Sequence, residues 1–377
     1  MNGGAFVALL VLGAPAWLAL PTQLSWQPQG ALSMFLALCG VGVGVSGVRD
    51  AFAARAIGRR GAREEAAPPL QFGGAGRSFL LTGATGFIGK KLVRALLRDG
   101  HCIAILTRQP RRAAWLFDGR VECVASMEQL ARSRRFDTVI NLAGAPILGW
   151  RWTAARKAAL GRSRSRSGLT DWLVAWIAAA EHKPALLLSA SAIGYDGTQA
   201  RGDDRVLDQN APPQPIFMSE LCREWEQAAQ GAAKYGVKVA LMRLGVVLGL
   251  EGALPMMLSP IKLGLGGPMG GGAQWLSWIH VDDVRGAIAH LCREQAAGVF
   301  NLTAPGCVPQ REFARVAAQV HARPSFVPTP GFPMRLALGE QASLLLDGQR
   351  VSGDKLRASG FGFSYPRIDQ ALRSLAA

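Results

Sequence analysis

The chain has 377 residues, 49% of them hydrophobic, and a formal net charge of +16 at pH 7 from 42 Lys and Arg against 26 Asp and Glu. This length allows more than one domain and a sizeable core. No nucleic-acid-binding motif accompanies the positive charge, so we exclude nucleic acid as a partner and retain an anionic membrane surface or a phosphorylated ligand.

The first 50 residues differ from the rest because they hold two uncharged apolar runs, Ala5–Leu20 and Ala31–Val48. Each run reaches the lower length limit for crossing a bilayer, and a short polar segment separates the two. A secretory signal fits less well, because residues 1–4 carry no basic side chain. We therefore expect residues 1–50 to form a transmembrane helical hairpin, which makes the membrane a partner of the N-terminal segment.

Residues 51–77 are expected to form a basic flank and a linker. Arginines crowd the first half of this stretch, and Pro and Gly mark the second half. Cationic side chains that follow a membrane span hold that flank in the cytoplasm. We therefore expect a membrane-bound protein whose remaining domains, including the nucleotide-binding domain described next, face the cytoplasm.

A glycine-rich turn follows the linker. The apolar run Phe79–Thr82 turns through three glycines into the helical stretch Lys90–Leu97. Glycines at this spacing let the backbone approach a pyrophosphate, and the free N–H groups at the helix start bind its charge. The alternative interpretation is a tight strand-to-helix turn with a purely structural role. The candidate cofactor-binding residues of the turn are Gly83, Thr85, Gly86, Phe87, Ile88 and Gly89.

The next strand, His101–Leu106, indicates which dinucleotide binds. An NAD enzyme places an acidic residue at the end of this strand for the ribose 2′-hydroxyl, whereas this chain has Thr107 and Arg108. A guanidinium binds a 2′-phosphate in a fork, which favours NADP as the cofactor. The competing interpretation is a solvated basic turn.

Strands and helices alternate from Ser78 onward, which predicts an α/β fold with a Rossmann-like, doubly wound parallel sheet. The further predicted elements are strand 136–144, helix 153–180, strand 184–189, helix 217–234, strand 237–244 and a helix that Asp282 or Asp283 caps and that runs to Arg293. The strand 136–144 ends in Leu142, Ala143 and Gly144, which leave space for a cofactor at the sheet edge.

Six motifs in order resemble the NAD-dependent epimerase/dehydratase family, and more narrowly its atypical extended short-chain dehydrogenase/reductase branch, the "epimerase family proteins". They lie at residues 83–89, 141–144, 189–195, 243–249, 264–268 and 278–283. Residues 339–372 are similar to the small C-terminal domain of unknown function in that branch. The resemblance implies an NADP-binding domain at 78–325 and a small C-terminal domain on the substrate side at 326–377.

The superfamily uses a Ser on the fifth strand and a Tyr-x-x-x-Lys pair on the next helix, and the resemblance places Ser191 at the serine position. The pair is missing, because none of Tyr195, Tyr235 and Tyr365 has a Lys four residues later. Without a general acid and base the rate falls about 10²–10⁴-fold, so another group substitutes or turnover is slow or absent. Tyr195 is the nearest substitute, although it equally fits a tyrosine packed against the cofactor ring.

Other candidate residues are weaker. Arg164 matches a position of the branch and would reach the cofactor or an anionic substrate, or it lies on a solvated helix face. His280 is either structural or a proton carrier. The glycine-rich segment 264–272 is either a lid over the site or a flexible connection. We assign no metal, and we expect the six widely spaced cysteines to be reduced thiols.

Two functions from different classes remain open. The first is an NADP-dependent oxidoreductase or epimerase-like enzyme, anchored to the membrane, with a small-molecule substrate that the sequence does not identify. The second is a non-catalytic NADP(H)-binding sensor or scaffold, which the missing Tyr-x-x-x-Lys pair favours. The sequence leaves the oligomeric state open.

Overall fold

The computed structural model describes residues 70–147, 151–164, 168–200 and 202–376. The predicted hairpin at 1–50 and the basic flank up to residue 69 lie outside these residues. Within them, no helix combines the length and the apolar character that crossing a bilayer requires.

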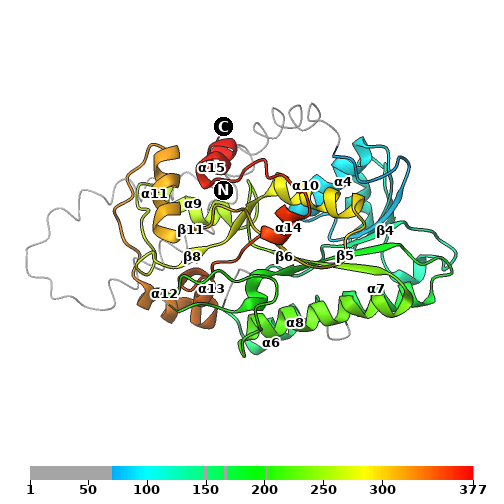
Figure 1. Cartoon of the computed structure of the whole chain (residues 1–377), viewed down its shortest axis with the longest axis horizontal. Coiled ribbons are helices and arrows are strands. Elements are labelled where there is room, and N and C mark those ends of the chain that lie inside the picture. Colours follow the sequence, from blue (N-terminus) through cyan, green and yellow to red (C-terminus); the bar gives the residue numbers. More distant parts are fainter. Residues whose placement is uncertain (1–69, 148–150, 165–167, 201, 377) are drawn as a thin grey trace, which may run out of the picture. The chain divides into compact units, whose positions relative to one another are not determined.

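A seven-stranded parallel sheet forms the centre, with strand order β10-β6-β5-β4-β1-β2-β3 (Figure 1). The strands are β1 (Ser78–Thr82), β2 (Cys102–Leu106), β3 (Glu122–Val124), β4 (Thr138–Asn141), β5 (Leu186–Ala192), β6 (Lys238–Leu244) and β10 (Gly298–Leu302). The order reverses between β1 and β4, which is the switch point where such sheets bind ligands. The predicted Rossmann-like sheet is confirmed.

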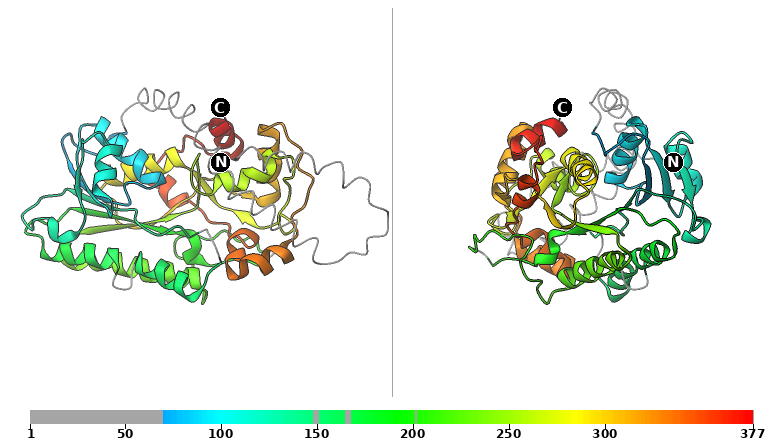
Figure 2. Two further views of the ribbon diagram at one scale, coloured as in Figure 1. Left: turned by 180° about the vertical axis from the view of Figure 1, so that it is seen from behind. Right: turned by 45° about the vertical axis from the view of Figure 1, so that its right-hand side comes forward.

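Helices cover both faces of the sheet (Figures 1 and 2). One layer contains α4 (Phe87–Arg98) and α10 (Val281–Arg293), and the other contains α6 (Ala154–Arg162), α7 (Leu169–Ala179) and α8 (Phe217–Gln230). Side chains alternate along each strand, so Phe79 and Leu81 pack toward the first layer and Leu80 toward the second. Strands buried on both faces explain the continuous apolar runs in the sequence.

The remaining elements lie beyond the carboxyl edge of the sheet or on its flanks. The helices are α5 (Pro110–Leu116), α9 (Leu254–Lys262), α11 (Gln310–Val320), α12 (Gly331–Leu338), α13 (Ser343–Leu346), α14 (Asp354–Ala358) and α15 (Ile368–Ala376). The 3-10 helices are η2 (Met127–Gln129), η3 (Ile193–Asp196), η4 (Gly231–Tyr235) and η5 (Gly339–Ala342). Two short pairs complete the fold: β7 (Val246–Leu248) with β9 (Trp278–His280), and β8 (Trp275–Leu276) with β11 (Val308–Pro309).

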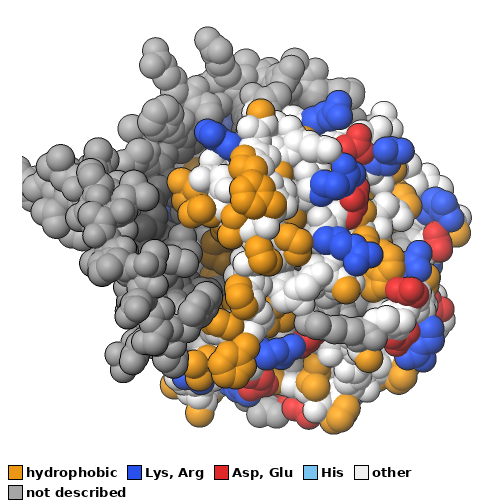
Figure 3. Space-filling model, turned by 90° about the vertical axis from the view of Figure 1, so that its left-hand side faces the viewer, with side chains coloured by type: hydrophobic (Ala, Val, Ile, Leu, Met, Phe, Trp, Pro, Cys, Tyr) orange, Lys and Arg blue, Asp and Glu red, His pale blue; other side chains and the backbone are white. Residues whose placement is uncertain are grey.

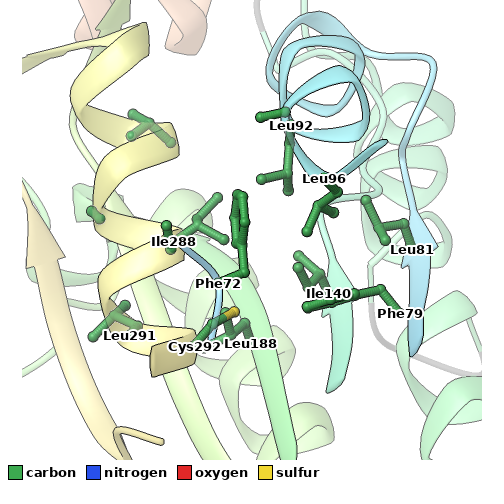
Figure 4. Close-up of a cluster of buried hydrophobic side chains, with 14 of the residues drawn as sticks. Phe72, Phe79, Leu81, Leu92, Leu96, Ile140, Leu188, Ile288, Leu291 and Cys292 are labelled. Carbon is green, nitrogen blue, oxygen red and sulfur yellow. The ribbon is translucent and has the colours of Figure 1, made fainter. Parts of the chain in front are cut away.

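The main core extends into the stretch that we expected to be a linker. Phe72 is fully buried and lies edge-on to Phe79 and His101. Figure 4 shows its ring between Ile288 of α10 and Leu96 of α4. The ordered packing of this domain therefore begins before its first strand.

Three predicted elements differ from the structure. The single helix expected at 153–180 is wrong, because two helices occupy this range and α7 begins after Gly168, which has extended backbone. The cap expected from Asp282 or Asp283 is also wrong, because His280 caps α10 by accepting the Asp282 N–H. The strand expected at 184–189 is shifted, because β5 pairs with β6 as far as Ala192.

Candidate functional site

A buried hydrogen-bond cluster fixes the carboxyl ends of three neighbouring strands. Thr82 of β1 donates its hydroxyl to Asn141 Oδ1 on β4 at 2.6 Å. The Asn141 amide donates to Ser189 Oγ on β5 at 3.2 Å and to Thr170 Oγ1 on α7 at 3.0 Å. The Ala143 N–H then donates to Thr82 Oγ1. Since these side chains are buried, the cluster fixes the ends of the three strands relative to one another where they face the candidate cofactor site.

Two glycines of the turn after β1, Gly83 and Gly89, have no space for a side chain. Gly83 has φ +71°, and a Cβ atom there would lie 2.6 Å from the Leu142 carbonyl carbon. A Cβ at Gly89 would collide with the Gly83 carbonyl oxygen. These contacts hold the loop against the end of β4. The N–H groups of the loop lie at the start of α4, and that helix has no acidic residue in its first turn. The arrangement suits a bound anion.

The other predicted residues of the loop differ in exposure. Thr85 and Gly86 are exposed, whereas Phe87 and Ile88 are partly buried. The Phe87 ring fills the space beside Gly249 and Gly252, so it ties α4 to the segment after β7. The loop thus presents its backbone outward and anchors itself through an aromatic side chain.

Thr107 and Arg108 follow β2 on the side of β1 away from β4. The Thr107 hydroxyl accepts the Gln109 N–H at 3.2 Å and shapes the turn into α5. Arg108 is exposed. Because β2 pairs with β1, the residue Arg108 follows the end of the strand next to the one that leads into the glycine loop, where the sequence predicted a 2′-phosphate contact.

On the other side of the loop, Leu142 and Ala143 are partly buried and Gly144 is exposed. Arg164 packs over Gly144 and donates to the Ala145 carbonyl at 2.7 Å. Its guanidinium lies over the Trp225 ring, and it is only 4% exposed, which rules out the solvated helix face. Burial lowers the pKa of Arg164 to about 10, and its Nε has no partner among the described residues.

Ser191 belongs to a buried ionic network that the sequence did not reveal. Its hydroxyl donates to Glu226 Oε1 at 2.7 Å. The Glu226 carboxylate accepts two hydrogen bonds from Arg243, at 2.8 and 2.9 Å. Arg243 lies directly opposite Ser191 in the β5–β6 pairing. The Glu226–Arg243 pair therefore fixes the orientation of the serine that the sequence predicted to face the substrate.

The Arg243 guanidinium also contacts a second carboxylate and an aromatic ring. Arg243 Nη1 donates to Asp196 Oδ1 at 3.2 Å, and the guanidinium stacks on Tyr195 with 3.5 Å to the ring centroid. Asp196 is 2% exposed, and its second oxygen has no partner among the described residues. Burial raises the pKa of Asp196 to about 7, because one cation is shared between two buried carboxyls.

The sequence analysis assigned no role to Glu226 or Arg243. The available signal was an Arg on a buried strand together with a Glu at a position of α8 that faces the sheet, since buried charges need partners. Nothing in the spacing showed that the two would meet at Ser191.

At the start of α8, apolar residues occupy the region where the superfamily places its Tyr-Lys pair. Phe217 packs edge-on against Trp152. The Lys157 ammonium, from α6, lies 4.8 Å from the centroid of the Phe217 ring and pairs with Glu340 at 2.5 Å. A lysine therefore approaches this region from a different helix.

His280 is held in a structural position. Its ring lies 3.9 Å from the Tyr365 ring and accepts the Asp282 N–H, and burial lowers the pKa of His280 to about 4. Asp283, the other predicted cap, accepts the N–H groups of Ser364 and Tyr365 instead. These contacts join α10 to the C-terminal segment.

The glycine-rich segment 264–272 pairs with residues 327–329. Thr329 donates its N–H to the Pro268 carbonyl at 2.9 Å and accepts the Gly270 N–H at 2.9 Å. A Cβ at Gly267 would collide with the Val327 carbonyl. The glycines thus allow two backbone segments to pack closely.

Replacing Gly83 with Ala is expected to lower the free energy of unfolding by about 2–4 kcal/mol. The added methyl group overpacks the Leu142 backbone and also forces an L-residue into a left-handed conformation. Gly100→Ala is the matched control, because Gly100 has φ +78° and open space around its Cβ, so only about 1–2 kcal/mol is expected. Urea unfolding of both variants measures the difference, and equal losses would contradict the close approach.

The raised pKa of Asp196 predicts that stability falls as the pH rises. The unfolded carboxyl titrates near 3.8 and the folded one near 7, so the folded chain keeps its proton longer and the unfolded state is favoured progressively between these values. Asp196→Asn should flatten this decline, which is at most about 4 kcal/mol. Melting temperatures at several pH values test this, with Asp118→Asn as the exposed control. An unchanged slope in Asp196→Asn would contradict it.

Comparisons with known proteins agree with this geometry. Residues 79–303 match the model of the NAD dependent epimerase/dehydratase family, and residues 329–375 match a domain of unknown function, DUF1731. The chain is 40% identical over 303 residues to the chloroplastic epimerase family protein SDR39U1 homolog of Arabidopsis thaliana, covering 78% of this chain and 85% of that protein. It is 36% identical over 306 residues to the epimerase family protein YfhF of Bacillus subtilis, covering 79% and 97%.

Solved structures give the same result. The human epimerase family protein SDR39U1, crystallised with NADPH, superposes with a TM-score of 0.70 at 30% identity, covering 79% of this chain and 99% of that one. A nucleoside-diphosphate sugar epimerase from Corynebacterium glutamicum superposes with a TM-score of 0.63 at 25% identity, covering 80% and 58%. The family model covers more than half of the chain and the plant relative exceeds 30% identity over most of its length. This chain belongs to the NAD-dependent epimerase/dehydratase family.

Proposed function

We propose that the protein is an NADP-dependent oxidoreductase or epimerase-like enzyme that acts on a small molecule. The observation that carries this proposal is the glycine loop, where Gly83 packs on the Leu142 backbone after β4 and Gly89 of α4 packs on the Gly83 carbonyl, so that the backbone turns tightly into the start of α4. A related human protein of the same family, 30% identical, was solved with NADPH, which supports the same dinucleotide here.

The residues present fit this cofactor. The N–H groups at the start of α4 would hold the pyrophosphate, and Arg108 would hold the 2′-phosphate. Leu142, Ala143 and Gly144 would border the dinucleotide where β4 ends. When bound, the cofactor would supply or accept a hydride. The unpartnered Arg164 Nε, beside Gly144, is a donor that a bound anion would satisfy.

On the substrate side, Ser191 is the group that we expect to orient a substrate oxygen. Its partner Glu226 accepts two hydrogen bonds from Arg243, so the Glu226 carboxylate is fixed in place and keeps the serine hydroxyl in one rotamer. Tyr195 lies against Arg243 at the next turn of the chain. Stacked on this guanidinium, Tyr195 is positioned by the network and would act together with Ser191.

Anchoring to the membrane by residues 1–50, with the nucleotide-binding domain in the cytoplasm, is part of this proposal. It is supported by the two uncharged apolar runs and by the arginines that follow them. The cytoplasm also supplies NADP(H). An extraction test with carbonate and with detergent distinguishes an anchored chain from one that only adheres to the surface.

A second candidate function is an NADP(H)-binding sensor without turnover. Two observations favour it: none of the three tyrosines has the required lysine, and the Ser191 hydroxyl is already engaged with Glu226. Both candidates share the cofactor and differ in whether a substrate reacts. Hydride transfer to any substrate decides between them.

Arg108→Glu should weaken NADPH binding severalfold or more and leave NADH binding nearly unchanged, because the new carboxylate repels only the 2′-phosphate. Calorimetric titration of the full chain in detergent with NADPH, NADP, NADH and NAD measures this. Arg94→Glu, an exposed charge reversal on α4, is the matched control. Equal losses for NADPH and NADH would remove the 2′-phosphate assignment, and no binding of any dinucleotide would overturn the proposed function.

Ser191→Ala should reduce substrate-dependent NADPH oxidation by about 10²–10³-fold, which is typical when one positioned hydrogen-bonding group is lost from a reaction centre. The affinity for NADPH should remain, since Ser191 lies beyond the glycine loop. A screen of carbonyl compounds monitored at the NADPH absorbance identifies a substrate first. Turnover that persists undiminished in Ser191→Ala would exclude this role, and no turnover with any compound would favour the sensor.

A further inference from the structure

Six of the eleven exposed large hydrophobic side chains in the described part of the chain come from two short stretches. They are Met256, Leu263, Leu265, Phe326, Phe332 and Leu336, with exposed fractions of 58, 62, 45, 75, 79 and 58%. We call this set the apolar face. Isolated exposed hydrophobic residues are ordinary, but a cluster of this kind marks an interaction surface.

The fold brings the two stretches together. Met256 lies on α9, and Leu263, seven residues later, is the C-cap residue of that helix. Phe332 and Leu336 are four residues apart on α12 and share one side of it. The intervening backbone segments are paired, because Val327 donates to the Gly266 carbonyl at 3.3 Å. Figure 3 shows hydrophobic side chains on the side of the molecule that carries α9, α11 and α12, with both basic and acidic side chains beside them.

The two stretches that carry the apolar face contain only basic charged residues, and Glu251 and Glu340 border them in the sequence. Residues 252–279 and 322–339 contain Lys262, Arg323 and Arg335 and no Asp or Glu. Arg335 pairs with Asp347 at 2.7 Å, whereas Lys262 and Arg323 are exposed and form no ion pair with a described residue. A protein partner would have to match both the exposed hydrophobic side chains and the basic residues beside them. An anionic bilayer offers a hydrocarbon interior and negatively charged headgroups together.

We propose that the apolar face inserts into a lipid bilayer that contains anionic lipid, with Lys262 and Arg323 at the headgroup level. This contact is separate from the anchoring expected of residues 1–50, and it does not depend on the cofactor. It would fix how the folded domain lies on the membrane. It also places the membrane next to the substrate side, because η5 follows α12 and its Glu340 pairs with Lys157 of α6.

A position-specific probe tests the proposal in the full chain. The variant Phe332→Cys is labelled with an environment-sensitive fluorophore in a Cys39→Ser, Cys102→Ser background, since Cys102 is the exposed thiol among the described residues and Cys39 lies outside them. The protein is reconstituted in vesicles of phosphatidylcholine and phosphatidylglycerol with nitroxide-labelled acyl chains. Trp115→Cys is the matched control, because Trp115 is 81% exposed on α5, away from the apolar face.

Emission from position 332 is expected to shift to the blue and to be quenched severalfold more strongly than emission from position 115. Lys262→Glu combined with Arg323→Glu should reduce the quenching in vesicles with phosphatidylglycerol and have little effect in pure phosphatidylcholine. Because the control shares the N-terminal anchor, anchoring alone cannot produce the difference.

Equal quenching at both positions would overturn the proposal. A blue shift at position 332 without quenching would also overturn it, because the face would then be covered by protein, either a second copy or another segment of this chain. A circular dichroism spectrum that matches that of the unmodified protein shows that each variant is folded. NADPH titration of the same samples tests the proposed function separately, so a loss there leaves the membrane contact unaffected.

Discussion

The arrangement of the site depends on one buried amide. Asn141 ends β4, and its side chain is bonded to β1, β5 and α7 at once. Parallel strands have no hairpin turns to fix their ends, so a polar cross-link at the carboxyl edge is an effective way to hold them in register. Because the amide is fully buried, a Leu in its place would leave the hydroxyls of Thr82, Thr170 and Ser189 without this partner. The glycine loop packs directly on the residue that follows Asn141.

A second constraint is that two buried carboxyls near Ser191, those of Glu226 and Asp196, share one cation, Arg243. Glu226 takes both hydrogen bonds that make a bidentate pair with Arg243, and Asp196 receives the weaker, longer contact. The network therefore holds one firm ion pair and one carboxyl that is easily protonated. In families with a Tyr-Lys pair the lysine supplies the positive charge from the helix, whereas here the cation comes from β6. The positive charge next to Ser191 is thus supplied by a strand of the sheet.

Much of the fold was predictable because it depends on local patterns. Apolar runs predicted β1 and β2, and the glycine spacing predicted the loop, since Gly83 and Gly89 meet backbone that no side chain can pass. The positions of Glu226, Asp196 and Arg243 were not predictable, because their meeting depends on the register between β5 and β6. The His280 cap was missed because Asp is the stronger capping residue by frequency, and here its carboxylate was needed at Ser364.

The C-terminal segment bears on how the chain is made. Leu356 is part of the main core together with Phe79 and Ile140, and Ala371 and Leu372 complete the cluster around Trp278. Asp283 holds the segment in place through two backbone N–H groups. Leu356 and Leu372 are the last fully buried members of their clusters to be synthesised. During translation both clusters therefore remain incomplete until the C-terminal segment is made, and the apolar side chains that this segment covers stay exposed until then.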